Sequence, residues 1–92
     1  MDSDVKSTRL AASGSVFGNR ARVKTIYVVA GATAGSVVIR DGGASGTILC
    51  TVDTPASATE TVIVDIPGNG ILCETDAYAI LTNVTACTVF YA

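Results

Sequence analysis

The side chains that most often carry catalysis are sparse in this sequence. Its 92 residues include no histidine, which removes the usual general base at neutral pH, the Ser-His-Asp triad and the commonest metal ligand. The three cysteines, Cys50, Cys73 and Cys87, are far apart and form no Cys-x-x-Cys pair. Each lies among residues that favour strands. We therefore interpret them as free, buried thiols and not as zinc ligands or a redox pair.

Acidic residues offer the remaining route to catalysis. Two carboxylates in a suitable arrangement hydrolyse glycosidic bonds. The acids available for such a pair are Asp53, Asp65, Glu74 and Asp76. None belongs to a recognisable motif, so we interpret them as solvated groups at strand ends and turns. The glycine-rich stretches 31–35 and 41–46 match neither a phosphate-binding loop nor a calcium loop. The sequence thus predicts a protein that is not an enzyme and uses no metal or cofactor.

Short apolar runs rich in Val, Ile and Thr set the fold class. No stretch shows the sustained 3,4 spacing of a helix, and turn residues such as Asp41-Gly42 and Pro67-Gly68 separate the runs. The strands expected from this pattern are 20–30, 36–41, 46–53, 60–66, 71–75, 77–82 and 86–91. Their spacing of roughly 8–12 residues predicts an all-β fold, an antiparallel β-sandwich of seven to eight strands with a jelly-roll-like arrangement.

The chain divides by composition into two parts. Residues 20–92 contain the expected strands and are assigned to the β-sandwich domain. Residues 1–19 are polar and small, with Val16 and Phe17 as an apolar pair near the end. This segment is either an N-terminal arm that docks on a neighbour or a first strand around Lys6–Ala12.

Three of the expected strands carry apolar residues on both faces. Arg20, Arg22 and Lys24 share one face of strand 20–30, whereas its second half is apolar throughout. In strand 46–53 the core face is expected to carry Ile48, Cys50 and Val52. The opposite faces of these strands, which mix apolar and polar residues, are expected to carry Ile26, Val28, Leu49 and Ile63. Apolar residues on a second face mark either a further internal layer or an interface.

Overall composition favours the interface. The chain is 49% apolar and 15% charged, with a mean hydropathy of +0.51, against about 25% charged residues in an average soluble domain. A domain this small buries only about 60% of the surface of its unfolded chain. A monomer that exposes Ala and Gly is one possibility. Burial of apolar surface between copies is the one we favour.

The charge pattern limits the partners. A net charge of −2 argues against nucleic acid, because phosphate binding needs a basic patch. No run of about 18 apolar residues predicts a membrane helix, and the first residues lack the order of a secretion signal. The basic residues gather in the first quarter and most of the acids lie later, a distribution that suits head-to-tail contacts between copies.

Residues 20–92 resemble small virion structural proteins of tailed bacteriophages, particularly the marine short-tailed phages. The likeness lies in a long strand ending in YVVAG, a Gly-Ser-Val-Val strand, the DGG turn, the IPG-x-G-I-L turn, a Tyr-x-x-Leu-Thr-Asn strand and a terminal TVFY. It implies a β-sandwich that serves as a capsid decoration (cement) protein or as a tail or head-fibre component. It also implies a homo-oligomer, a trimer above all, bound to other virion proteins such as the major capsid or tail protein. Such a subunit is assembled in the host cytoplasm and resides in the virion.

The leading hypothesis is therefore a subunit that works by association. Its candidate interface residues are Lys6, Arg9, Leu10, Val16, Phe17, Arg22, Lys24, Ile26, Val28, Leu49 and Ile63. The basic ones are expected to set orientation more than affinity. The alternative is a carbohydrate- or receptor-binding module with a pocket lined by Tyr27, Tyr78 or Tyr91. An enzyme is the third and weakest hypothesis, because histidine is missing.

Overall fold

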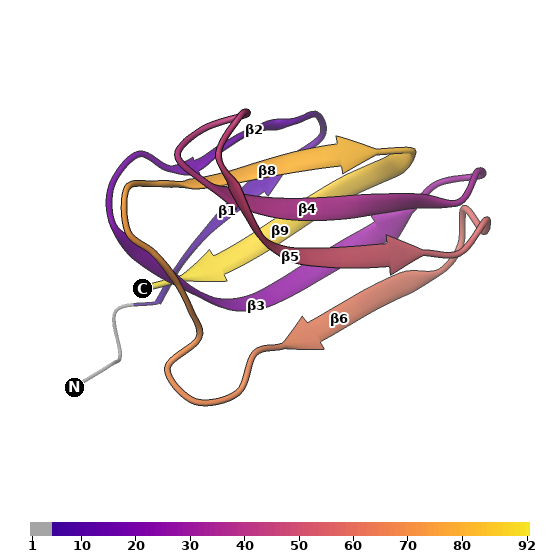
Figure 1. Ribbon diagram of the computed structural model, residues 1–92. Coiled ribbons are helices and arrows are strands. Elements are labelled where there is room, and N and C mark those ends of the chain that lie inside the picture. Colours follow the sequence, from indigo (N-terminus) through magenta and orange to yellow (C-terminus); the bar gives the residue numbers. More distant parts are fainter. Residues whose placement is uncertain (1–4) are drawn as a thin grey trace.

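Nine strands make up residues 5–92, the part of the chain that the computed structural model describes. They are β1 (Lys6–Leu10), β2 (Gly14–Phe17), β3 (Ala21–Ala30), β4 (Gly35–Asp41), β5 (Thr47–Thr54), β6 (Thr61–Asp65), β7 (Ile71–Cys73), β8 (Ala77–Thr82) and β9 (Val84–Tyr91). All pairings are antiparallel and the strands form two sheets (Figure 1). The predicted all-β antiparallel sandwich is confirmed.

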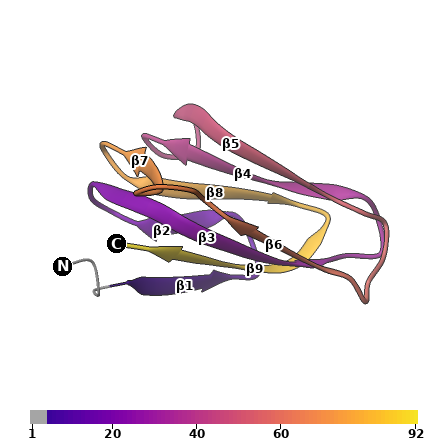
Figure 2. The same ribbon diagram turned by 90° about the horizontal axis from the view of Figure 1, so that it is seen from below.

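The strands pair in the nested order of a jelly roll. The central hairpin is β4–β5, and outside it β3 pairs with β6 and β7, β2 with β8, and β1 with β9. This places β1-β9-β3-β6 in the five-stranded sheet, in which β7 also pairs with β3, and β2-β8-β4-β5 in the four-stranded sheet. Figure 2 shows the two layers, with β4 and β5 on one side and β1 and β9 on the other. In both sheets, strands from the first half of the chain thus pair with strands from the second half.

A β-bulge in β3 decides which of its residues enter the core. Ala21 and Val23 are buried, and so are Ile26, Val28 and Ala30, so the buried positions change from odd to even numbers along one strand. The register with β9 shifts between Val23 and Thr25, and the extra residue in a bulge turns the following side chains to the opposite face. The prediction that Ile26 and Val28 lie at an interface is therefore wrong. Both have 0% exposure and form the centre of the core.

A second bulge has the same effect in β5. Ile39 pairs with Cys50 but Arg40 pairs with Ile48, which leaves Leu49 as the extra residue. Leu49 packs against the core, whereas Ile48 is 54% exposed. The predicted faces of these two residues are thus exchanged. Val52, beyond the bulge, is buried as expected.

Residues 6–17 form part of the sandwich. β1 pairs with β9 and β2 pairs with β8, so each joins a strand some 60 or more residues further along the chain. Leu10 and Phe17 pack against the core, Val16 is buried, and the Phe17 ring stacks on Tyr91 with centroids 5.0 Å apart. Of the two alternatives for residues 1–19, a strand is found over Lys6–Leu10, and a second one follows it. Residues 1–4 lie outside the described part.

Candidate functional site

The outer face of the five-stranded sheet carries a mostly uncharged surface. Paired residues point to the same side of a sheet, and the register aligns Arg9, Thr88, Tyr27 and Ile63 in one row across it. Ile63 is 62% exposed, whereas Tyr27 and Thr88 are half-buried. The neighbouring row consists of Ser7, Phe90, Thr25 and Asp65.

An open groove lies at one end of this face. It has a volume of about 430 Å³ and is lined by Val5, Lys24, Thr25, Gly68 and Phe90. Val5 is 48% exposed. Lys24 is the single charged residue among the described residues of this lining. From residues 5–92 the groove therefore receives apolar surface and one cation, and no acid–base pair.

The outer face of the four-stranded sheet also exposes apolar side chains. Val38 pairs with Ile80, and Arg40 lies between Tyr78 and Ile48. The Arg40 guanidinium donates through Nη1 to the carbonyl of Gly46 at 2.8 Å, which holds it against the β4–β5 turn. With Ile48 exposed beside it, this face too could pack against another protein.

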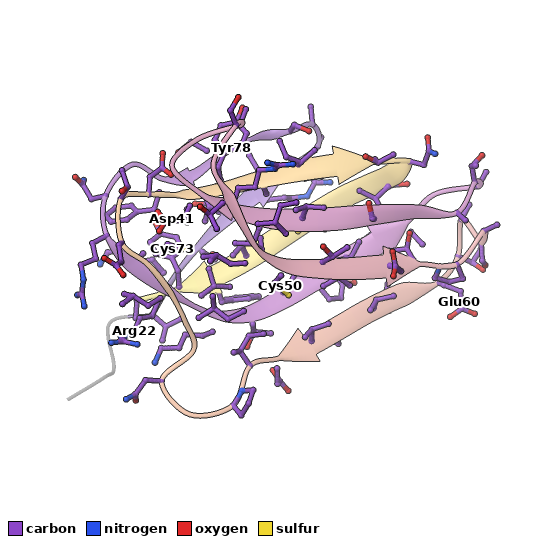
Figure 3. All side chains as sticks on the ribbon, in the orientation of Figure 1. Arg22, Asp41, Cys50, Glu60, Cys73 and Tyr78 are labelled. Atoms are coloured by element: carbon purple, nitrogen blue, oxygen red, sulfur yellow. The ribbon has the colours of Figure 1, made fainter. Side chains whose placement is uncertain are left out.

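The two lateral edges of the sandwich differ in charge. β1 ends the five-stranded sheet on one side, and its Lys6 and Arg9 are exposed. On the other side β5 and β6 end the two sheets. Their exposed acids are Asp53, Glu60 and Asp65. The only hydrogen bond found for these acids among the described side chains joins Thr25 Oγ1 to Asp65 Oδ1 at 3.0 Å. In Figure 3, Glu60 and Arg22 lie at opposite ends of the molecule.

Two aspartates, Asp41 and Asp76, join loops at one end of the sandwich. Figure 3 shows Asp41 close to Cys73. The Asp41 carboxylate accepts hydrogen bonds from the backbone N–H groups of Glu74, Thr75 and Asp76 at 2.9–3.3 Å. Asp76 Oδ1 in turn accepts from the N–H groups of Gly42 and Gly43 at 2.9 and 3.0 Å. This reciprocal arrangement, the Asp41–Asp76 clasp, ties the β4–β5 turn to the β7–β8 loop.

The Asp41–Asp76 clasp predicts that the stability of the folded protein depends on pH in a specific way. Hydrogen bonds from the Thr75 and Glu74 N–H groups lower the pKa of Asp41, so the contribution of this carboxylate is present above its ordinary pKa and lost as the pH falls through the lowered value. We expect Asp41→Asn to lower the urea midpoint of unfolding at neutral pH, and the gap to wild type to narrow as the pH falls below the ordinary pKa of an aspartate. Glu74→Gln, which removes an exposed carboxylate next to the clasp, should follow wild type. Parallel curves for wild type and Asp41→Asn would contradict this assignment.

The acids considered for catalysis lie on different elements, β5, β6 and the loop between β7 and β8. Asp53 lies on β5 and Asp65 on β6, in different sheets, and Asp76 is engaged by backbone N–H groups. Within residues 5–92, no three His, Cys, Asp or Glu side chains come together as a possible metal site. The three cysteines are free, and Cys73 and Cys87 are buried as predicted, whereas Cys50 is half-buried. Burial raises the pKa of Cys73 and of Cys87 to about 11, which keeps both thiols protonated and unreactive at neutral pH.

The predicted interface residues fall into three groups. Leu10, Val16, Phe17, Ile26, Val28 and Leu49 are buried or packed against the core. Arg22 and Lys24 are half-buried near the start of β3. Lys6, Arg9 and Ile63 are exposed on the edge strands β1 and β6. Sequence reasoning missed Ile48, Asp41 and Val5, and the Asp-Gly turn signal is the feature that could have drawn attention to Asp41.

The tyrosines proposed for a sugar pocket are dispersed. Tyr27 lies on the outer face of the five-stranded sheet and Tyr78 on that of the four-stranded sheet, whereas Tyr91 is buried under Phe17. No pocket in the described structure can therefore be lined by all three.

Comparison of the chain with protein-family models, with curated proteins and with solved structures found no match. In the described part of the chain no helix could span a membrane.

Proposed function

We propose that this chain is a structural subunit of a tailed-phage virion, a capsid decoration (cement) protein or a tail or head-fibre component. It acts through association with copies of itself, in a trimer above all, and with neighbouring virion proteins such as the major capsid or tail protein. The observation that carries this proposal is the exposure of large apolar residues on both outer faces of a jelly roll, 62% for Ile63 and 54% for Ile48.

Energetics support a role for these faces in association. Apolar surface removed from water contributes roughly 25 cal/mol per Å², and association has to exceed its own entropic cost before any affinity remains. Two half-apolar sheet faces can supply that area, whereas a single exposed isoleucine cannot. Flat faces of paired strands also suit packing against another flat surface, because their backbone is already fixed and little further ordering is needed.

The fold alone does not distinguish a virion subunit from a carbohydrate-binding module, because jelly rolls occur in both capsid proteins and lectins. Specific features favour assembly over sugar binding. Among residues 5–92, one cation and no acid line the groove beside Phe90, and the aromatic residues are dispersed. Sugar recognition needs several polar groups converging beside an aromatic ring, which these surfaces do not supply.

The test is mass spectrometry of purified phage particles from a lysate in which this chain is expressed. We expect the chain in the particles, in stoichiometric proportion to a capsid or tail protein. Its restriction to the soluble fraction of the lysate would contradict a virion role. A glycan array run with the purified protein distinguishes the alternative, since saturable glycan binding without particle association would favour the carbohydrate-binding module.

A further inference from the structure

The two edges of the five-stranded sheet are complementary in charge and in strand direction. β1 presents exposed Lys6 and Arg9, whereas β6 and the residue before it present Asp65 and Glu60. Every neighbour along β1-β9-β3-β6 is antiparallel, so β1 and β6 run in opposite directions. A second copy placed beside the first would therefore continue the sheet with an antiparallel β6–β1 pair.

On this basis we propose that copies of the chain join head to tail, with β1 of one copy pairing with β6 of the next. The proposal rests on the proposed function and names the surface through which self-association occurs. Its occupant is a second copy of this chain, and the backbone N–H and C=O groups along the two edges would form the ladder.

The proposed register continues the rows of one copy into the next. The row Ser7–Phe90–Thr25–Asp65 extends to Ser7 of the next copy, and the row that ends in Ile63 extends to its Arg9. Arg9 then lies diagonally opposite Asp65 on the same face, within reach of a long side chain. The aliphatic part of Arg9 covers Ile63, the most exposed large apolar residue of the described chain.

Symmetric pairing of like edges is disfavoured by the same charges. Two β1 edges facing each other would bring Lys6 and Arg9 of one copy against those of the other, and two β6 edges would oppose their Asp65 and Glu60 side chains. Like charges opposite one another destabilise a strand pair. Arg22 and Lys24 lie on β3, two strands from β1 and next to β6, and Lys24 directly precedes Thr25, the partner of Asp65. These two cations therefore add nothing to the β1 edge, and the attraction between copies depends on Lys6 and Arg9 against Asp65 and Glu60.

Head-to-tail contacts are heterologous, so each copy uses two different surfaces. Such contacts close into a ring when the rotation between neighbours fits and otherwise continue as a filament. The right-handed twist of the sheet rotates each copy relative to the last. A closed ring of any size satisfies every β1 and every β6 edge, and a ring of three is the one compatible with the trimer of the proposed function.

Charge reversal tests the pairing in the full chain. Arg9→Glu and Asp65→Arg each replace an attraction by a repulsion, so each should weaken self-association about tenfold, measured as the dissociation constant in sedimentation velocity at low salt. The double variant Arg9→Glu/Asp65→Arg restores an opposite pair and should return to within about threefold of wild type. Arg20→Glu and Glu74→Arg carry the same charge changes on exposed residues outside strands β1 and β6, and should match wild type.

The outcomes distinguish the proposed edge pairing from self-association in general. Rescue by the double variant supports the edge pairing. An oligomer that is indifferent to both single reversals, or a double variant weaker than either single one, overturns the edge pairing and leaves association through the sheet faces standing. If the wild-type chain stays monomeric, both the edge pairing and self-association in general are contradicted. If circular dichroism shows that a reversal prevents folding, Arg9→Gln and Asp65→Asn repeat the comparison, and their failure to weaken association would equally overturn the pairing.

Discussion

Replacing Ile26 by alanine is expected to lower the free energy of unfolding by about 2–5 kcal/mol. Ile26 lies in the central strand β3 between β9 and β6, is fully buried, and is among the largest side chains of the core. The loss combines the transfer of the missing methyl groups with the cavity that remains. Because domains of this size are stable by only about 5–15 kcal/mol, urea unfolding followed by circular dichroism will show the shift clearly.

Ile63→Ala is the matched control for this substitution, with the same chemical change in the adjacent strand. Ile63 is mostly exposed, so the variant should unfold within about 0.5 kcal/mol of wild type when both are measured as monomers. Equal losses for Ile26→Ala and Ile63→Ala would show that the bulge in β3 and the inward position of Ile26 are wrongly assigned.

Ile63→Lys is expected to have the largest effect on assembly. It removes an apolar side chain from the surface proposed to be covered, and it places a cation beside Arg9 of the next copy. Lysine on an exposed edge strand is also a common device against edge-to-edge pairing. We expect the dissociation constant of the oligomer to rise about 30-fold, with the folded circular dichroism spectrum retained.

Ala44→Lys provides the control for added charge, because Ala44 is exposed in the β4–β5 turn and belongs to neither β1 nor β6. This variant should associate like wild type. If it weakens association as much as Ile63→Lys does, net charge and not the β6 surface governs the assembly.

The sequence predicted the fold class because its strand and turn signals are local. Alternating β-branched residues, the Asp41-Gly42 turn and the Pro67–Gly70 turn fix most of the strands and their approximate limits. Gly42, Gly43, Gly68 and Gly70 all adopt positive φ, which glycine tolerates and other residues rarely do. Such signals act over a few residues and can be recognised without knowledge of pairing partners.

The residues that were misassigned depend on distant partners. Simple alternation places Ile26 of β3 on the outer face and Ile48 of β5 on the core face. Register shifts against β9 and β4 move each residue to the opposite face. A bulge belongs to a pair of strands, so the sequence of one strand does not reveal it. The same holds for β1, whose polar sequence becomes a strand through pairing with β9, and for Asp41, whose partners lie 33–35 residues away.

The sequence predicted which types of side chain the candidate site contains, but it did not predict where the fold places them. The basic front and acidic remainder are visible in the sequence. The jelly-roll order places Lys6 and Arg9 of β1 and Asp65 of β6 at opposite ends of one sheet, whereas Arg22 and Lys24 lie on β3, directly beside β6. Charges from distant segments thus come together only through the strand order, which the sequence does not reveal.

The most direct test of this account is the solution mass of the wild-type chain, measured by light scattering from micromolar to millimolar concentration. A mass that rises to a defined multiple of 9.3 kDa, about threefold for the ring, is the expected result, with the transition moved to higher concentration by added salt. A constant mass of 9.3 kDa across the whole range would mean that the apolar side chains on the outside of this jelly roll remain in contact with water, and would contradict the assembly role.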